Sequence, residues 1–513
     1  MNINILKKWN EQYLRLSSFN RKARRTLKKR WKKSLLVIAL ALALGVSDAS
    51  AATITVGETE LGIGAVTIED DGICSITEAL QNANDTSGTA PNNDCETGDS
   101  ADGINGADII ELPSNSTFTF DGINPSTFTG DGQNALPLIT SNITIEGNAS
   151  VLERMEDPLP PGAPIPDFRI INTNGNLTLN NLTLRNGREN FGGAVINDIS
   201  NDVITLTLNN CTVSGNTSLS DGGGINSYRG NLTINNSNIS QNSAFGDGGG
   251  IYNNRSNLSI NNSFITENSA LSNGGGIYHD GNSNTTFDLI NSNVSYNLSQ
   301  QNGGGIYSRE DFTVTNSTIS NNMAGFNGGG LFSIFNSLSI TNTTISQNTA
   351  TYGGGIRIDS TFNITNSIIA NNISTNTSNI LANCDLFFSV IVEENNLSDD
   401  DSCSFDSDTS SESFISDCLE PPLADNGGPT LTHALLDPND PNTPSTCTQN
   451  PAIDGGDNAA CPSTDQRGFI RPFPVGGACD IGAFELQPTG SGMCNMAEIP
   501  EDGVDNNGDG QSL

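Results

Sequence analysis

The sequence predicts an all-β protein, a right-handed parallel β-helix in which each coil takes about 26 residues. Three observations lead to this expectation. A block of alternating apolar residues recurs along the chain, a Gly-Gly-Gly element follows several of these blocks, and only 6% of the residues are aromatic and 35% hydrophobic. So few large apolar side chains suit a narrow, stacked core better than one large globular core.

The apolar block reads apolar-x-apolar-x-Asn-Ser-x-apolar in its clearest copies, such as LTINNSNIS from Leu232. Its apolar residues alternate with Thr, Ser or Asn, which is the period of a strand rather than of a helix. Asparagine also tolerates left-handed backbone, and stacked copies can form ladders of amide hydrogen bonds. The copies lie 24 to 29 residues apart and begin at Leu177, Leu206, Leu232, Leu258, Phe287, Phe312, Leu338 and Phe362.

The Gly-Gly-Gly element lets the chain turn where any Cβ atom would collide. Coils stacked about 4.8 Å apart would bury a continuous core and pair every strand in parallel. A leucine-rich repeat would show a different leucine spacing, a propeller a period of about 40, and a calcium-binding nonapeptide solenoid a period of nine, so the β-helix is favoured. Copies of the element begin at Asp221, Asp247, Asn273, Asn302, Asn327 and Tyr352.

Residues 1–52 are expected to be a secretory signal peptide with a long basic n-region. This region holds 12 of the 22 cationic side chains, the last of them at Lys33, and an apolar run from Leu35 to Leu44 follows. That run is too short for a membrane span. Removal of this segment would leave ten arginines and 55 carboxylates, a formal charge near -45, which argues against nucleic acid as a partner.

All ten cysteines follow the presequence, and an even number in an exported chain indicates a disulfide framework. The expected pairs are Cys74 with Cys95, Cys384 with Cys403, and Cys461 with Cys479, each closing a loop of about 20 residues. Cys211 stands apart in the sequence and is expected to be a buried thiol.

Several segments resemble known bacterial surface proteins. GGGIY after Asn-Ser-Ala, with Phe264–Asn268 upstream of one copy, resembles the repeats of polymorphic outer membrane proteins. CSITEALQNAN from Cys74 resembles the CSLREAI module. The segments from Leu423 to Leu436, Pro451 to Gly456, Asp465 to Gly468 and Cys479 to Glu485 resemble the choice-of-anchor Q family. These resemblances imply an exported bacterial β-helix, displayed at the surface and without agreed catalytic residues.

Five parts of the chain follow from these patterns. After the signal peptide, residues 53–165 would form the CSLREAI-like capping region and the first irregular coils, and residues 166–375 the regular coils. Residues 376–487 would form a disulfide-rich C-terminal cap of choice-of-anchor Q type, and residues 488–513 an acidic tail. Caps are expected because the end coils of a solenoid expose unpaired strand edges.

One row of charged residues follows the Gly-Gly-Gly strand in successive coils. Such a row can hold cations and carboxylates along one groove, which is how proteins contact acidic polysaccharides and arrange acid/base chemistry. The competing interpretation is a set of exposed turn residues that keep the edge soluble and pair locally. The row consists of Arg229, Arg255, His279, Asp280, Arg309, Glu310, Asp311 and Arg357.

The tail carries oxygen side chains at alternate positions followed by glycine, which matches the first half of an EF-hand calcium loop. Its candidate ligands are Asp505, Asn507 and Asp509. Calcium is therefore a candidate ligand, although no cofactor is required by any other motif.

The function expected from the sequence is that of an exported, non-enzymatic surface or matrix protein for adhesion or glycan binding, with an extracellular polysaccharide or cell-surface ligand as partner. The alternative is a polysaccharide lyase or glycoside hydrolase that acts on acidic polysaccharide. The alternative requires two or three carboxylates that converge in one cleft.

Overall fold

A computed structural model describes most of the chain. The described residues are 52–57, 72–85, 92, 94–96, 108–124, 132–156, 165–198, 204–281, 285–335, 337–359, 361–376, 383–387, 390–405 and 415–487. The predicted signal peptide up to residue 51, Cys494, and the candidate calcium ligands Asp505, Asn507 and Asp509 lie outside them. Within the described part, no helix is both long and apolar enough to cross a membrane.

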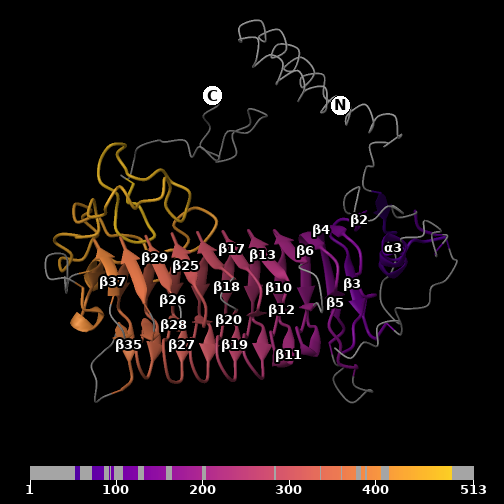
Figure 1. The fold of residues 1–513 in the computed structure, drawn as a ribbon. Helices are drawn as coiled ribbons and strands as arrows, with labels where there is room; N and C mark the ends of the chain where they lie inside the picture. The colour runs from indigo at the N-terminus through magenta and orange to yellow at the C-terminus, as the bar shows by residue number, and fades with distance from the viewer. Residues whose placement is uncertain are drawn as a thin grey trace, which may run out of the picture. The chain divides into compact units, whose positions relative to one another are not determined.

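The chain forms the predicted parallel β-helix, with strands stacked side by side along one axis (Figure 1). Each regular coil gives two strands to a 21-stranded sheet, one to an 8-stranded sheet and one to a 9-stranded sheet. All named strand pairs in the three sheets are parallel, and equivalent residues of neighbouring coils lie opposite one another, as Leu232 does opposite Leu258.

The 21-stranded sheet consists of β1 (Thr53–Thr55), β2 (Asp108–Glu111), β3 (Thr117–Phe120), β4 (Ile143–Arg154), β6 (Leu177–Arg185), β9 (Thr205–Asn209), β10 (Thr212–Ser214), β13 (Asn231–Asn235), β14 (Asn238–Ser240), β17 (Leu258–Asn261), β18 (Phe264–Thr266), β21 (Phe287–Ile290), β22 (Asn293–Ser295), β25 (Phe312–Thr315), β26 (Thr318–Ser320), β29 (Leu338–Thr341), β30 (Thr344–Ser346), β33 (Phe362–Thr365), β34 (Ile368–Ala370), β37 (Val390–Glu394) and β38 (Leu397–Ser398).

The 8-stranded sheet consists of β7 (Arg188–Phe191), β11 (Thr217–Asp221), β15 (Ser243–Ala244), β19 (Ser269–Ala270), β23 (Leu298–Ser299), β27 (Met323–Ala324), β31 (Thr349–Ala350) and β35 (Ile373–Ser374). The 9-stranded sheet consists of β5 (Ile171–Thr173), β8 (Val195–Asp198), β12 (Ile225–Tyr228), β16 (Ile251–Asn254), β20 (Ile277–Asp280), β24 (Ile306–Ser308), β28 (Leu331–Ile334), β32 (Ile356–Asp359) and β36 (Cys384–Leu386).

One coil shows how the sequence period makes the core. Leu232 and Ile234 on β13, Ile239 on β14 and Ile251 on β16 all point inward and are at most 1% exposed. Each stacks on the corresponding apolar residue of the next coil, so that one continuous core cluster runs from Ile54 to Cys403. The residues between them point outward, which is why the period is two.

A ladder of buried asparagines runs between the 21-stranded and the 8-stranded sheets. In each coil the Nδ2 group donates to the Oδ1 atom of the next asparagine, for example from Asn242 to Asn268 and from Asn268 to Asn297, both at 3.0 Å. The same Nδ2 group of Asn268 also donates to the carbonyl oxygen of Ile239 at 2.8 Å. The ladder therefore satisfies polar groups inside the solenoid.

The Gly-Gly-Gly element is required by close packing between coils. Gly248 has a φ of +68°, which favours glycine. A Cβ atom on Gly249 would overlap the carbonyl oxygen of Gly275 in the next coil. The repeated glycines thus allow the backbones of successive coils to approach at the entry to the 9-stranded sheet.

The CSITEAL segment forms the helix that its spacing predicts, near the start of the solenoid. Helix α3 (Ile76–Ala83) begins with a capping box between Ser75 and Glu78 and packs against β1 and β2. Its apolar residues Ile76, Ala79 and Leu80 are fully buried in the same core cluster as the coils.

The C-terminal region differs from the expected end cap. Strands β36, β37 and β38 continue the solenoid by one more coil beyond residue 375, and they end with the short 3-10 helix η3 (Asp401–Cys403). The following segment, residues 415–487, begins with α4 (Ile415–Cys418) and is otherwise made of loops and turns with a few isolated antiparallel β-bridges. These loops fold back along the outer side of the 21-stranded sheet, and we call them the lateral cap (Figure 1).

Among the described residues, four disulfides link segments near the start of the solenoid, in its last coil and in the lateral cap, which indicates folding in an oxidising compartment. The three predicted pairs are present, together with Cys418–Cys447, which the sequence did not single out. The thiol of Cys211 is buried, and its Sγ atom lies 3.3 Å from the carbonyl oxygens of both Leu179 and Asn209, in the place that serines take in the following coils. Burial raises the pKa of this thiol to about 11.

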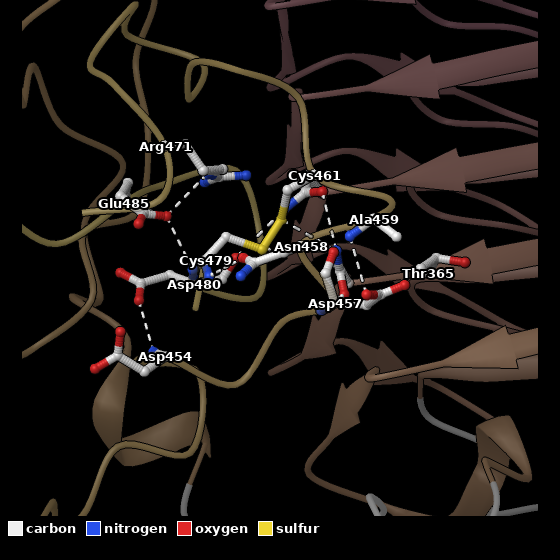
Figure 2. Close-up of a disulfide and its surroundings, with 12 residues drawn as sticks. Thr365, Asp454, Asp457, Asn458, Ala459, Cys461, Arg471, Cys479, Asp480 and Glu485 are labelled. Carbon is white, nitrogen blue, oxygen red and sulfur yellow. Dashed lines mark hydrogen bonds and ion pairs between the residues drawn. A yellow bond between two sulfur atoms is a disulfide. The ribbon is translucent and has the colours of Figure 1, made fainter. Parts of the chain in front are cut away.

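Charged side chains are buried inside the lateral cap. Arg471 pairs with Glu485 at 2.9 Å, and both side chains are fully buried (Figure 2). Glu485 accepts hydrogen bonds from the backbone N–H groups of Phe473 and Asp480. Asp480 accepts from the N–H groups of Asp454 and Leu486, and burial followed by the charge of Glu485 raises its pKa to about 7. These groups hold the loops together and are closed to substrates.

We expect Asn268→Ala to destabilise the solenoid, because it leaves the Asn242 amide and the Ile239 carbonyl group without their buried partner. The loss should be about 2 kcal/mol. Thermal unfolding followed by circular dichroism should show a lower midpoint than for Asn257→Ala, which removes an exposed side chain of the same coil. Equal midpoints for the two variants would contradict the structural role of the ladder.

Candidate functional site

The predicted row of charged residues lies at the 9-stranded sheet, but a column of aromatic rings stands at its centre. Tyr252 on β16, Tyr278 on β20, Tyr307 on β24 and Phe332 on β28 occupy equivalent outward positions. Arg357 on β32 takes the next position of the column. We call the outer side of these strands, with its flanking residues, the aromatic face.

The rings of this column stack along the solenoid axis. The centroids of Tyr252 and Tyr278 are 5.1 Å apart with 5° between the ring planes, and those of Tyr278 and Tyr307 repeat this geometry. Phe332 meets Tyr307 edge to face at 5.5 Å. Because the ring faces contact one another, they present edges and hydroxyl groups outward rather than flat surfaces.

One flank of the aromatic face is a ladder of carboxylates and amides at the Gly-Gly-Gly turns. The Oδ1 atom of Asp221 accepts from the N–H group of Asp247 at 2.8 Å, and Asp247 accepts in the same way from Asn273. Hydrogen bonds between side-chain amides continue the ladder. Asn302 Nδ2 donates to Asn273 Oδ1 at 2.8 Å, and Asn327 Nδ2 donates to Asn302 Oδ1 at 2.6 Å. Burial raises the pKa of Asp221, and the charge of Asp247 acts in the same direction.

The other flank holds hydrogen bonds to the tyrosine hydroxyl groups. Asn254 Nδ2 donates to the hydroxyl oxygen of Tyr252 at 2.9 Å, and the hydroxyl of Tyr278 donates to Asp280 at 3.4 Å. Arg309 Nη1 pairs with the same Asp280 carboxylate at 3.2 Å. Burial raises the pKa of Tyr252 to about 12 and that of Tyr278 further, so both tyrosines stay protonated in neutral solution.

The arginines of the predicted row lie at the surface and contact aromatic rings. Arg229 and Arg255 are both exposed and lie over Tyr228, at 4.8 and 5.8 Å from the ring centroid. Arg309 lies 5.4 Å from the centroid of the exposed Phe335. Each arginine therefore has a local partner within its own coil or a neighbouring one.

Arg357 is the most enclosed arginine of the row. Its guanidinium pairs with Asp385 at 2.6 Å and with Asp359 at 3.4 Å. It also lies 5.1 Å from the ring centroid of Phe387 and 5.7 Å from that of Tyr352. These contacts place it at the end of the aromatic column, toward the last coil.

His279 does not belong to the surface row. It follows Tyr278 on β20, and neighbouring residues of a strand point to opposite sides, so its ring is directed into the solenoid and is fully buried. Its Nδ1 atom lies 3.0 Å from Asn253 Nδ2, and its ring packs against Phe287. Burial lowers its pKa to about 4, and the ring cannot contact a ligand on the surface.

Glu310 and Asp311 lie in the turn after β24, beside the aromatic face rather than within it. Asp311 is exposed, and its Oδ1 atom accepts from the N–H group of Ser337 at 2.7 Å. Glu310 is half-buried, and its carbonyl oxygen accepts from the hydroxyl of Ser308. These contacts fit residues that shape the turn.

Sequence reasoning missed the tyrosines and the Asp221–Asn327 ladder. The signal was available, because Tyr follows Gly-Gly-Gly-Ile in three copies and Asp or Asn precedes the glycines in five. The predicted row groups residues by charge and ignores the alternation of side chains along a strand. It therefore combines residues that point inward with residues that point outward. Within the described residues, no three His, Cys, Asp or Glu side chains are arranged to hold a metal ion.

A separate hollow of about 420 Å³ lies over β3, β4 and β6, at the outer side of the 21-stranded sheet. Its carboxylate Glu153 accepts from Thr119 Oγ1 at 2.9 Å and pairs with Arg185. The hollow is lined by Thr119, Glu153, Met155, Glu156, Arg185 and Asn186.

Comparison with known proteins gives a structural likeness. No family model and no curated protein matches the chain. A solved structure described as the crystal structure of pectate lyase Pel9A resembles it, with a TM-score of 0.46 and 14% sequence identity. The match covers 86% of this chain and 98% of the other.

We expect His279→Asn to make the solenoid less sensitive to acid. The pKa of this group is about 4 in the folded state, against an ordinary value of 6.5, so as the pH falls below 7 the unfolded chain binds the proton first. The free energy of unfolding therefore decreases as the pH falls from about 7 to about 4. At pH 5 the decrease caused by this histidine should be about 2 kcal/mol. Asparagine already fills the equivalent position at Asn253.

The measurement is the thermal midpoint of both proteins at pH 7 and pH 5. The decrease of the thermal midpoint from pH 7 to pH 5 should be smaller for the variant than for the unaltered chain. Burial also lowers the pKa of His433, and the part of the decrease that comes from this histidine remains in both proteins. An identical decrease would show that His279 titrates like an exposed histidine.

Proposed function

We propose that the protein is an exported, non-enzymatic β-helix of the cell surface or extracellular matrix, and that its aromatic face binds polysaccharide. The observation that carries the proposal is the periodicity of that face. Tyr252, Tyr278 and Tyr307 repeat at 5.1 Å, each with polar neighbours in its own coil. A repeating surface suits a repeating ligand, because every coil offers a similar set of groups and the contacts act together.

The chemistry of the face supports a glycan ligand. Sugar hydroxyl groups both donate and accept hydrogen bonds, and the face offers donors and acceptors side by side at Asn254, Asp280 and Arg309. The guanidinium groups could also pair with uronate carboxylates. The rings are edge-on, so hydrogen bonding rather than stacking on the ring faces would give most of the contact.

The alternative function, a polysaccharide lyase or glycoside hydrolase, is less well supported by the contacts of this face. Asp280 is paired with Arg309, while Asp221 and Asp247 each accept a backbone hydrogen bond from the next coil. A general acid or base needs a carboxylate that is free to reach the substrate. Calcium remains part of the proposal only through the tail residues Asp505, Asn507 and Asp509.

We expect the mature chain to bind at least one polysaccharide of a panel that includes polygalacturonate, with and without calcium, in biolayer interferometry. Arg309→Ala should weaken binding at least fivefold, which corresponds to about 1 kcal/mol. Arg185→Ala, which removes an arginine from the hollow over β3, β4 and β6, should leave binding unchanged. Binding that is unaffected by Arg309→Ala would move the ligand away from the aromatic face.

We further expect no new reducing ends when the chain is incubated with the same panel. Product that disappears with Asp280→Asn or Arg309→Ala would replace the binding proposal by the enzymatic one. Product that persists in both variants would place an active site elsewhere in the chain.

A further inference from the structure

The lateral cap is held by a second periodic surface, at the outer side of the 21-stranded sheet. In each coil of this surface an asparagine with a left-handed backbone stands between the two segments that the coil gives to this sheet. An outward Thr, Asn or Phe follows two positions later, except in the coil of Asn366, where this residue is Ile368. We call this column the turn-asparagine ladder. Its members include Asn181, Asn210, Asn236, Asn262, Asn291, Asn316, Asn342 and Asn366.

The later rungs of the ladder bind main-chain groups of the lateral cap. Asn316 Nδ2 donates to the carbonyl oxygen of Thr464 at 2.7 Å, and Asn342 Nδ2 donates to that of Asp480 at 3.3 Å. Asn366 donates to the carbonyl oxygen of Asp457 at 3.0 Å and accepts from its N–H group at 2.8 Å. The covered part of the ladder thus contacts mainly main-chain groups of the cap, together with the guanidinium of Arg471 and the sulfur atoms of Cys461 and Cys479.

The outward side chains that follow these asparagines add a second line of contacts. Thr318 Oγ1 donates to Gln466 Oε1 at 2.6 Å, and Thr344 Oγ1 accepts from the N–H group of Ala483 at 3.1 Å. Ser320 bonds His433 at 2.8 Å. The interface between the cap and the solenoid therefore repeats polar groups in successive coils, and Ile368 adds apolar contacts with the cap in the coil of Asn366.

The earlier rungs present the same groups but are not covered by the cap. Asn210 and Asn236 are exposed, and Asn262 is half-buried. No described residue forms a hydrogen bond with the side-chain amides of these three asparagines. The ladder therefore continues as an open surface directly from an interface that the chain already uses.

A hollow marks the boundary between the covered and the open rungs. It has a volume of about 300 Å³, and Pro429 of the cap forms one side of it. The next cap residue, Thr430, donates its hydroxyl to the carbonyl oxygen of Asn291 at 3.0 Å, which fixes this side against the solenoid. The hollow is lined by Asn210, Cys211, Thr212, Asn236, Ser237, Asn238, Asn262, Phe264 and Pro429.

We propose that the open rungs of the turn-asparagine ladder bind an extended polypeptide segment of a partner protein, with one apolar side chain in the hollow beside Phe264 and Pro429. Asn181 is also exposed and extends the open rungs by one coil. Three strand spacings separate Asn181 from Asn262, about 14 Å, which corresponds to four or five residues of extended chain. The segment would accept from the asparagine amides through its carbonyl groups. Its sequence should be neutral or basic, since the mature chain is strongly acidic.

The continuity with the cap interface favours polypeptide over glycan at this surface. The covered rungs bond carbonyl and N–H groups of the backbone, and the open rungs repeat the same residue type, backbone conformation and position. This site is separate from the aromatic face, which lies on the 9-stranded sheet, so each proposal can fail without the other.

The test uses the full mature chain and a phage library of random linear 12-residue peptides. Peptides that are enriched on the unaltered chain are synthesised and measured against Asn236→Asp/Asn262→Asp, which replaces two amide donors by acceptors and keeps side chains that tolerate the left-handed backbone. The control is Asn257→Asp, an exposed position in the coil of Asn262, whose Oδ1 atom can still accept from Thr286. Phe264→Thr, which places at this rung the residue found at Thr318, tests the hollow.

The proposal predicts at least a tenfold loss of peptide affinity in the double variant and in Phe264→Thr, with no loss in Asn257→Asp and unchanged thermal midpoints. It is overturned if no peptide is enriched, or if the enriched peptides bind all variants equally. It is also overturned if the double variant loses polysaccharide binding instead, because the ladder would then be a glycan site.

Discussion

Stacking of one coil on the next is the constraint on which the rest of this structure depends. Every coil must place its strands in parallel register with those before and after it, and the buried amides from Asn242 to Asn372 link neighbouring coils at the same point. An insertion in one coil must therefore leave as a loop, because a shift of one residue would turn every core side chain outward. Glycines such as Gly249 are fixed by the same constraint, since the adjacent coil leaves no space for a Cβ atom.

The register inside the solenoid also determines what the outside can do. Because Ile251, Ile277 and Ile306 stack inward, Tyr252, Tyr278 and Tyr307 must stack outward, and any feature that recurs in the sequence becomes a straight column on the surface. Two such columns carry the proposed binding functions. The aromatic face displays hydroxyl, carboxylate and guanidinium groups, whereas the turn-asparagine ladder offers amides and is already used in part by the lateral cap.

The parts of the structure that obey the period could be predicted from the sequence, and the parts that do not obey it could not. The alternation in Leu232, Ile234 and Ile239 was sufficient to predict the strands and the core. His279 was assigned to the surface because its charge, rather than its position after Tyr278, decided the alignment. The lateral cap was expected at the end of the solenoid, since nothing in the loops of residues 415–487 indicates that Thr464 and Asp480 bond the sides of earlier coils. Such contacts join residues more than a hundred positions apart, and no repeating pattern in the sequence indicates them.

We propose that function lies in repeated columns rather than in one catalytic centre. The decisive measurement is hydrogen–deuterium exchange of the protein with and without a polysaccharide to which it binds. We expect slower exchange in several successive coils at once, in peptides that contain β16, β20, β24 and β28, with little change in the 8-stranded sheet. Protection confined to a single coil, or centred on the 8-stranded sheet, would contradict it.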